Sequence, residues 1–309
     1  MVEPLMKAFT DYSVVLEPDR NEPGWWAGAP SVVRAADGTF WLAARMRETI
    51  SPPGFRGFEL RILKSADGVR FEPVHAIRRE NAGVRGFERP ALVIDPSTRK
   101  FRLYACSPRE EGGWHIILFD EADDPSRIDA ASARSVLEPP AAWGHGIEPG
   151  YKDPVVLFAQ GLWHMYVIGI DRVERTFHFT SADGLGWMAD PNNPVLESAG
   201  WHNFYTRPAC VVPTGIGYLF VYEGSNAKWH DPNYNIGTGL AYTLDLSRMT
   251  DLTPDAPALT STTPGRYLTW RYSHWLRVGD TFHVYAECAR PNDSNEIRLF
   301  RVPAFDIIR

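Results

Sequence analysis

The sequence has few features that would tie it to an oxidising compartment, to nucleic acid or to a membrane. Its three cysteines form no CxxC pair, and an odd count of them fits a reducing compartment. A net charge of −6 gives no basic footprint for nucleic acid. No apolar run approaches the roughly 20 residues of a membrane helix, and residues 1–20 lack the apolar core of a signal peptide. We therefore expect a cytoplasmic protein with no nucleic-acid or membrane partner.

Helical periodicity is also scarce. Apolar residues seldom recur at a spacing of 3.6, and residues 121–132 are the best candidate for a short helical segment. The chain is nevertheless 44% hydrophobic over 309 residues, which excludes disorder and is enough for a substantial core. These features predict an all-β protein.

Self-comparison of the sequence reveals a repeat. Five segments share a small or polar tip, usually with proline, then an apolar run, a turn and an aromatic-rich run. Pairs such as DG and QG between the two runs are signals for hairpin turns. The segments start about 55–65 residues apart, which is close to the length of a propeller blade. They are residues 28–45, 88–106, 152–168, 206–224 and 271–288.

A second pair of strands is predicted after each hairpin. The motif SADGxxF/W occurs at the same phase of the repeat at 65–71 and again at 181–187. Similar fourth strands occur at 135–140 and 194–198, whereas the last unit, which ends at 309, has none. Residues 13–18 (SVVLEP) match the missing strand and are predicted to pair with the last unit, which would remove open sheet edges.

The sequence therefore predicts a single domain over residues 1–309, a five-bladed β-propeller with four-stranded antiparallel blades and a ring closed by the N-terminal strand. A β-sandwich of many short strands is the alternative, against which the equal spacing argues. The blades are expected at roughly 25–77, 84–140, 148–198, 203–262, and 268–309 with strand 13–18.

In a propeller the first strands line the central channel, so the five tips that precede them are neighbours in space. The tips are rich in carboxylates, cations and aromatic rings, where tips without a function would more often be Gly, Asn and Ser. They comprise residues 25–29, 86–89, 151–153, 204–207 and 270–274.

The SxDGxxW turn, the DPVV tip at 153–156 and the strand end VYEG at 221–224 resemble five-bladed glycosidase-type propellers. These include glycoside hydrolase families 43, 32 and 68 and the family-130 mannoside phosphorylases. The resemblance extends over nearly the whole chain as a repeat pattern, but each motif is short. It implies an axial pocket in which carboxylates cleave a glycosidic bond of a small or terminal sugar unit.

Glycoside cleavage needs one protonated and one ionised carboxyl group that flank the bond. Asp153 best matches the Asp-Pro position of the family's third blade, and Glu88 occupies the equivalent tip of the second. Glu223 and Glu287 share a phase at the ends of the second strands of blades four and five. These four are the candidate catalytic residues, although each of the glutamates could also be a solvated or cation-paired structural group.

Two positions depart from the families. Families 43 and 32 carry an acid before the proline of the first tip, where this chain has Ala29. Family 43 has EGP at the fourth tip, where this chain has Thr206-Arg207-Pro208. A hydrolase, a phosphorylase or enzyme for anionic sugars, and a non-catalytic carbohydrate-binding propeller therefore all stay open.

The remaining candidates would bind a sugar or an ion. Guanidinium and ammonium groups can bind phosphate or carboxylate, or only balance nearby acids. Indole and phenol rings offer faces on which sugars stack. His274 resembles the blade-five histidine that lies by an axial ion in family 43, so an axial Ca²⁺ or Na⁺ ion is possible, although no cofactor is required. The candidates for substrate binding are Arg89, Lys152, Arg207, Arg271, Trp25, Trp26, Trp201, Trp270, Tyr272 and His145.

Overall fold

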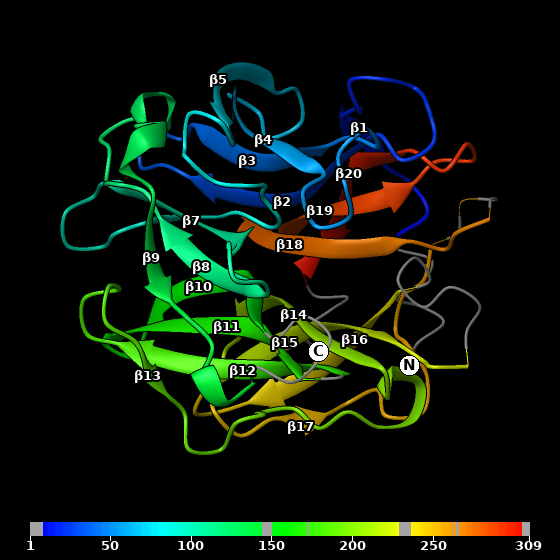
Figure 1. Cartoon of the computed structure of the whole chain (residues 1–309). Helices are drawn as coiled ribbons and strands as arrows, with labels where there is room; N and C mark the ends of the chain where they lie inside the picture. Colours follow the sequence, from blue (N-terminus) through cyan, green and yellow to red (C-terminus); the bar gives the residue numbers. More distant parts are fainter. Residues whose placement is uncertain are drawn as a thin grey trace.

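The structure is a computed structural model that describes residues 9–143, 150–171, 173–228, 236–261, 263 and 266–304. In these residues it contains twenty β-strands and four 3-10 helices of three residues each (Figure 1). Two of the 3-10 helices, η1 (Pro125–Arg127) and η2 (Ala130–Ser132), fall in the segment with the best helical pattern. No helix among the described residues is long and apolar enough to cross a membrane.

The strands pair into antiparallel units of four that follow the predicted repeat. The first unit contains β2 (Trp26–Arg34), β3 (Phe40–Arg47), β4 (Gly57–Ser65) and β5 (Glu72–Arg78). The second contains β6 (Ala91–Ile94), β7 (Phe101–Pro108), β8 (Trp114–Leu118) and β9 (Arg134–Leu137). The third contains β10 (Gly150–Ala159), β11 (Leu162–Asp171), β12 (Val173–Ser181) and β13 (Met188–Ala189). The fourth contains β14 (Tyr205–Pro213), β15 (Tyr218–Ser225), β16 (Gly237–Thr243) and β17 (Thr250–Asp251).

The last unit combines the two ends of the chain. It contains β18 (Trp270–Val278), β19 (Thr281–Ala289), β20 (Asn295–Pro303) and, from the N-terminal side, β1 (Ser13–Leu16). Ser13 pairs with Leu299 and Leu16 with Ile297, and Figure 1 shows β1 beside β20. The predicted pairing of the N-terminal strand with the last unit is confirmed.

Successive units are linked by single parallel pairs at the strand starts, such as Trp26 with Asn295 and Glu174 with Tyr205. These links join the strands into two open sheets, one of eight strands and one of twelve. The five first strands nevertheless contact one another in the cyclic order β2, β6, β10, β14, β18 and back to β2.

The hydrophobic core lies between the units. Each of five core clusters packs residues of two consecutive units, because both faces of every unit are covered by a neighbour. One cluster joins the last unit to the first, where Leu42 and Leu63 pack with Tyr285 and Ile297. This arrangement brings the start of each first strand into one central region.

The repeated SADG turn is built from local side-chain hydrogen bonds. Ser65 Oγ accepts the N–H of Gly68 at 2.9 Å, and Asp67 Oδ1 accepts that of Val69 at 2.9 Å. The second copy is the same, with Ser181 and Asp183 as acceptors. A third copy occurs at residues 243–248, where Thr243 and Asp245 accept and Leu246 takes the left-handed glycine position with φ 65°.

Candidate functional site

The starts of the first strands share one register. Across the hairpins Gly28 lies opposite Arg45, Lys152 opposite Ile168, Arg207 opposite Glu223, and Arg271 opposite Glu287. In the second unit, the N–H of Glu88 donates to the carbonyl of Cys106. The predicted equivalence of Glu223 and Glu287 is therefore confirmed by strand pairing.

In three of the units a β-bulge directly follows the first-strand residue that pairs with the end of the second strand. The pairing register shifts just after Gly28, Lys152 and Arg271, and the next residues Ala29, Asp153 and Tyr272 have φ of 51–55°. A non-glycine residue in this region is strained, and bulges re-aim side chains near binding sites. Here the bulges of the third and fifth units bring Tyr272 OH to 3.1 Å from Asp153 Oδ2, to which it donates.

Asp153 lies at the centre of a hydrogen-bonded group. Its side chain is 1% exposed and accepts the N–H of Arg89 at 3.4 Å and the S–H of Cys106 at 3.4 Å, as well as the Tyr272 hydroxyl. Its own N–H donates to the Cys106 sulfur at 3.2 Å. Residues of two other units, the second and the fifth, therefore fix the orientation of this one carboxylate.

Arg45 links two of the other candidate acids. Its guanidinium is fully buried and donates to Glu88 and, at 2.8 Å, to Glu287. Glu287 also accepts from Arg271 at 2.9 Å, from Asn295 at 2.6 Å, and, at 3.0 Å, from the N–H of the bulge residue after Gly28. All the acceptor positions needed to stabilise its ionised form are used.

These contacts decide the charge of both glutamates. Burial raises the pKa of Glu88, but the charges of Arg45 and Lys152 outweigh it and lower that pKa to about 2. Burial also opposes ionisation of Glu287, yet Arg271 and Arg45 lower its pKa below the ordinary value. Both groups are carboxylates at neutral pH.

Glu223 has a different environment. It is 1% exposed and accepts the N–H of Ser273 at 3.1 Å, and it forms no ion pair with any described residue. Burial raises its pKa to about 7, against the opposing charges of Arg89 and Arg207. This is the condition of a group that carries a proton at neutral pH and can give it up.

The cations of the site are only partly engaged by acids. Arg207 pairs with Glu174, and the guanidinium of Arg89 donates to the carbonyls of Pro208, at 3.0 Å, and of the following residue. The Lys152 ammonium lies 4.5 Å from the Trp114 ring centre and forms no ion pair with a described residue. Burial opposes its charge, but the carboxylates of Asp153 and Glu88 raise its pKa.

Arg45 and Glu174 belong to this charged group but are absent from the candidate set. Arg45 occupies the same repeat phase as Glu287, and a comparison of the five phases places it there, but the phase alone does not show that it binds two acids. Glu174 lies at the start of the third strand of its unit, opposite Tyr205. A search limited to the tips before the first strands does not include this position.

The predicted stacking aromatics separate into two groups. Trp26 faces the cations, with Arg47 3.9 Å and Arg271 5.0 Å from its ring centre, and Trp25 lies in a separate surface hollow below Arg20.

Trp201 and Trp270, in contrast, are core residues. Trp201 stacks on Tyr222, and Trp270 packs against Phe9 and Phe300. A sugar-stacking role does not fit these two rings, because aromatic neighbours already contact them. The remaining substrate candidate, His145, lies outside the described residues.

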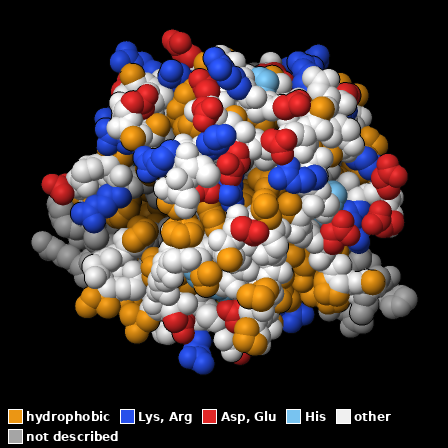
Figure 2. All heavy atoms as spheres, turned by 90° about the vertical axis from the view of Figure 1, so that its left-hand side faces the viewer, with side chains coloured by type: hydrophobic (Ala, Val, Ile, Leu, Met, Phe, Trp, Pro, Cys, Tyr) orange, Lys and Arg blue, Asp and Glu red, His pale blue; other side chains and the backbone are white. Residues whose placement is uncertain are grey.

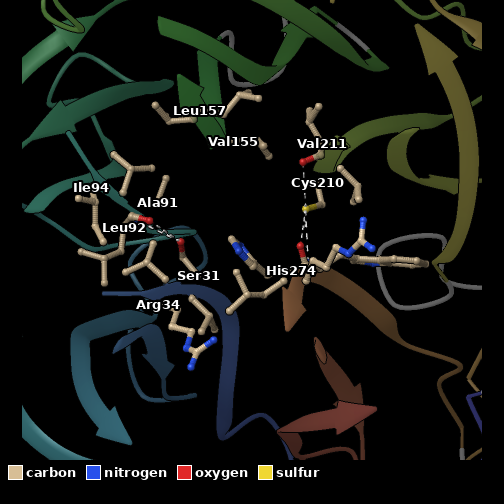
Figure 3. Close-up of a pocket in the computed structure, with 18 of the residues that line it drawn as sticks. Ser31, Arg34, Ala91, Leu92, Ile94, Val155, Leu157, Cys210, Val211 and His274 are labelled. Atoms are coloured by element: carbon tan, nitrogen blue, oxygen red, sulfur yellow. Dashed lines mark hydrogen bonds between the residues drawn. The ribbon is translucent and has the colours of Figure 1, made fainter. Parts of the chain in front are cut away.

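A cavity of about 600 Å³ lies between the first strands, further along them than the charged group (Figure 3). It is lined mainly by aliphatic residues, and Arg89 contributes to its wall. The buried acids described above are not part of its lining, so this cavity and the charged group at the tips are distinct parts of the central region.

The cavity lining does not fit the expected axial cation. His274 points into the cavity (Figure 3), and burial lowers its pKa to about 3. Ca²⁺ and Na⁺ take oxygen ligands, but the described lining has no Asp or Glu and has three arginines. The described residues also contain no group of three or more His, Cys, Asp or Glu that could hold a metal.

Gly28 allows the close approach of Glu287, and its replacement is a test of this packing. A Cβ at Gly28 would lie 1.8 Å from Glu287 Oε2, a group that four donors hold in place. We expect Gly28→Ala to lower the free energy of unfolding by about 1–3 kcal/mol in urea titrations. Gly186→Ala is the matched control, since nothing lies within 4 Å of a Cβ there. Equal midpoints for the two variants would contradict the described packing.

Comparison with known proteins places this geometry in context. No protein-family model and no curated protein matches the sequence. Solved structures match nearly all of it: a glycoside hydrolase has a TM-score of 0.75 at 13% identity, over 97% of this chain and 94% of its own. A β-1,2-mannobiose phosphorylase from Listeria innocua, in complex with β-1,2-mannobiose, has a TM-score of 0.66 at 13% identity, over 95% of each chain. An α-L-arabinofuranosidase from Lactobacillus brevis has a TM-score of 0.63 at 13% identity, over 93% and 92%.

At these identities the likeness establishes the fold. The chain has the fold of the propeller glycosidases and related phosphorylases, and the resemblance predicted from its sequence motifs is confirmed at that level.

Proposed function

We propose that this protein is a glycoside-active enzyme in which Glu223 is the general acid. The observation that carries the proposal is the divergence of two buried glutamates in one charged group. The pKa of Glu88 is lowered to about 2, whereas that of Glu223 is raised to about 7. Cleavage of a glycosidic bond requires one protonated and one ionised carboxyl group, and the contrast between Glu88 and Glu223 supports the coexistence of both forms in this charged group at neutral pH.

Asp153 is the preferred partner of Glu223 in this proposal. Three donors from the second and fifth units fix its carboxylate, and no ion pair with a described residue engages it, so in the proposal it is left to act on a substrate or a water molecule. Glu88 and Glu287 are each held by Arg45, and in the proposal they orient the cations around the site. Trp26 and Tyr272 supply aromatic faces next to these groups.

The proposed scaffold is a single five-bladed propeller closed by β1. The cyclic contacts of the five first strands and the core cluster between the last unit and the first support it. In that arrangement the bulged strand starts surround the axis, and a small or terminal sugar unit would enter from the tip face.

Phosphorolysis is the second candidate, because of the Lys152 ammonium. This group is cationic and forms no ion pair with a described residue, while Arg89 and Arg271 lie near the same Tyr272 ring, at 5.8 and 4.9 Å. A phosphate ion or the carboxylate of an anionic sugar would be a direct ion-pair partner for this ammonium group.

A substrate panel tests the proposal. Aryl glycosides and oligosaccharides, neutral and anionic, are incubated with the protein with and without inorganic phosphate, and released sugar and sugar 1-phosphate are measured. We expect turnover of at least one glycoside that is lost in Asp153→Asn. Release that depends on phosphate and yields a sugar 1-phosphate would assign a phosphorylase instead of a hydrolase. Sugar binding without turnover, unchanged in Asp153→Asn, would contradict the enzyme and favour a carbohydrate-binding propeller.

A further inference from the structure

The cavity between the first strands has a lining that is unsuited to a sugar. Its wall is formed by valine, leucine, isoleucine, proline and alanine residues, among them Leu92, Val155 and Leu157 (Figure 3). Its volume of about 600 Å³ is in the range of small-molecule sites, which are commonly 300–1,000 Å³.

Three polar side chains of the lining, those of Ser31, Cys210 and Arg89, already have hydrogen-bond partners in the protein. Ser31 exchanges hydrogen bonds with the backbone of Leu92, where its Oγ accepts the N–H at 2.9 Å. The sulfur of Cys210 accepts the N–H of Trp275 at 3.4 Å, and Arg89 donates to two backbone carbonyls. A ligand inside the cavity would therefore meet an apolar surface, on which a sugar would lose hydrogen bonds to water without replacement.

The charge at the cavity is of one sign. Arg34 and Arg277 lie on the lining near the ends of β2 and β18, and both are exposed. Arg34 donates to the Gly38 carbonyl and Arg277 to the Gly279 carbonyl, and neither forms an ion pair with a described residue. No Asp or Glu is found among the described lining residues.

The position of the cavity separates it from the proposed catalytic group. In Figure 1 β18 runs from right to left, so its C-terminal end points toward the left side of the molecule. Figure 2, which faces that side, shows hydrophobic side chains toward the middle of the face with both cationic and acidic side chains around them. Asp153 and Glu223, which lies opposite the tip residue Arg207, are at the other end of the first strands.

We infer that this cavity binds an amphipathic anion, a molecule with an unbranched or aromatic apolar body and one carboxylate, such as a medium-chain fatty acid. The body fills the aliphatic cavity, and the carboxylate accepts hydrogen bonds from Arg34 and Arg277 at its mouth. Charge complementarity and the satisfied polar lining select this class over sugars, cations and neutral lipids. The inference does not depend on a glycosidic reaction at the tips.

Calorimetric titration with decanoate, and with decanol as the neutral probe of equal chain length, tests the inference on the full chain. We expect decanoate to bind at a single site, about tenfold or more tighter than decanol, which is the contribution of one charge-assisted contact. Leu157→Trp, which fills the cavity, is expected to abolish binding of both probes.

Two matched double variants measure how much the two arginine charges contribute to decanoate affinity. Arg34→Gln with Arg277→Gln should weaken decanoate about tenfold and leave decanol unchanged. Arg127→Gln with Arg301→Gln removes the same charge from exposed residues outside the cavity and should bind both probes as the wild type does. Thermal unfolding checks that each variant is folded.

Three results would overturn the inference: no decanoate binding by the wild-type chain, equal decanoate affinity of the two double variants, or a folded Leu157→Trp protein that still binds both probes.

Discussion

Glu223→Gln is expected to lower kcat/KM by about 10²- to 10⁴-fold for a glycoside with a poor leaving group, which is the usual contribution of a general acid. The amide keeps the size and the acceptor oxygen for the Ser273 N–H, at 3.1 Å in the wild type, but it has no proton to give. The loss should shrink for an aryl glycoside with a strongly acidic leaving group, such as a dinitrophenyl glycoside, because that oxygen leaves without protonation.

The pH dependence of kcat/KM is a second test of the role of Glu223. The pKa of Glu223 is raised to about 7 by burial, so the acid is protonated below that pH and ionised above it. We expect kcat/KM to fall as the pH rises through about 7, and this basic limb should be absent in Glu223→Gln. Steady-state rates between pH 5 and 9 measure it.

Glu197→Gln, at an exposed position of the third unit, is the control and should keep both the rate and the profile. A Glu223→Gln protein that retains the basic limb, or that loses the same factor for every leaving group, would assign the proton to another group.

Most of the fold could be predicted from the repeat, because hairpin turns and strand-start tips have recognisable short sequence patterns. Asp67 and Asp183 each stand two residues after a serine and directly before a glycine, and the same hydrogen bonds form in both turns. The third copy of the turn could not be predicted, because Leu246 stands where the other two copies have glycine. This buried leucine has φ 65° in the packed fourth unit. A pattern that requires glycine cannot detect a left-handed leucine that tertiary contacts stabilise.

The site was predicted less completely, because its properties depend on which acid meets which cation. Glu223 and Glu287 have the same repeat phase and are both buried, yet Glu287 forms ion pairs with Arg45 and Arg271, whereas Glu223 forms none with a described residue. Their pKa values therefore move in opposite directions, upward for Glu223 and downward for Glu287, a difference that strand phase does not encode. Trp270 shows the same limit, since a tryptophan at the start of a strand can face the axis or the core.

Arg45→Met is expected to be the most destabilising single change in the charged group. Arg45 is fully buried and binds Glu88 and Glu287, so its loss leaves Glu88 ionised and buried without its nearest cation. Removal of one partner from a buried ion pair costs about 3–5 kcal/mol, whereas an exposed pair contributes at most about 1 kcal/mol. Urea unfolding at pH 7 measures the difference, and Arg70→Met, at an exposed arginine paired with Asp67, is the control.

The pH dependence and a second substitution identify the origin of the loss. Without Arg45 the pKa of Glu88 rises from its low native value, so protonation relieves the buried charge and the deficit of Arg45→Met should shrink as the pH falls from 7 to 4. Arg45→Met with Glu88→Gln should recover part of the stability at pH 7, because Glu287 still accepts from Arg271 and Asn295. A single variant no less stable than Arg70→Met, or a deficit that stays constant with pH, would mean that water or a neighbouring cation replaces the guanidinium, and that the charged group does not depend on Arg45.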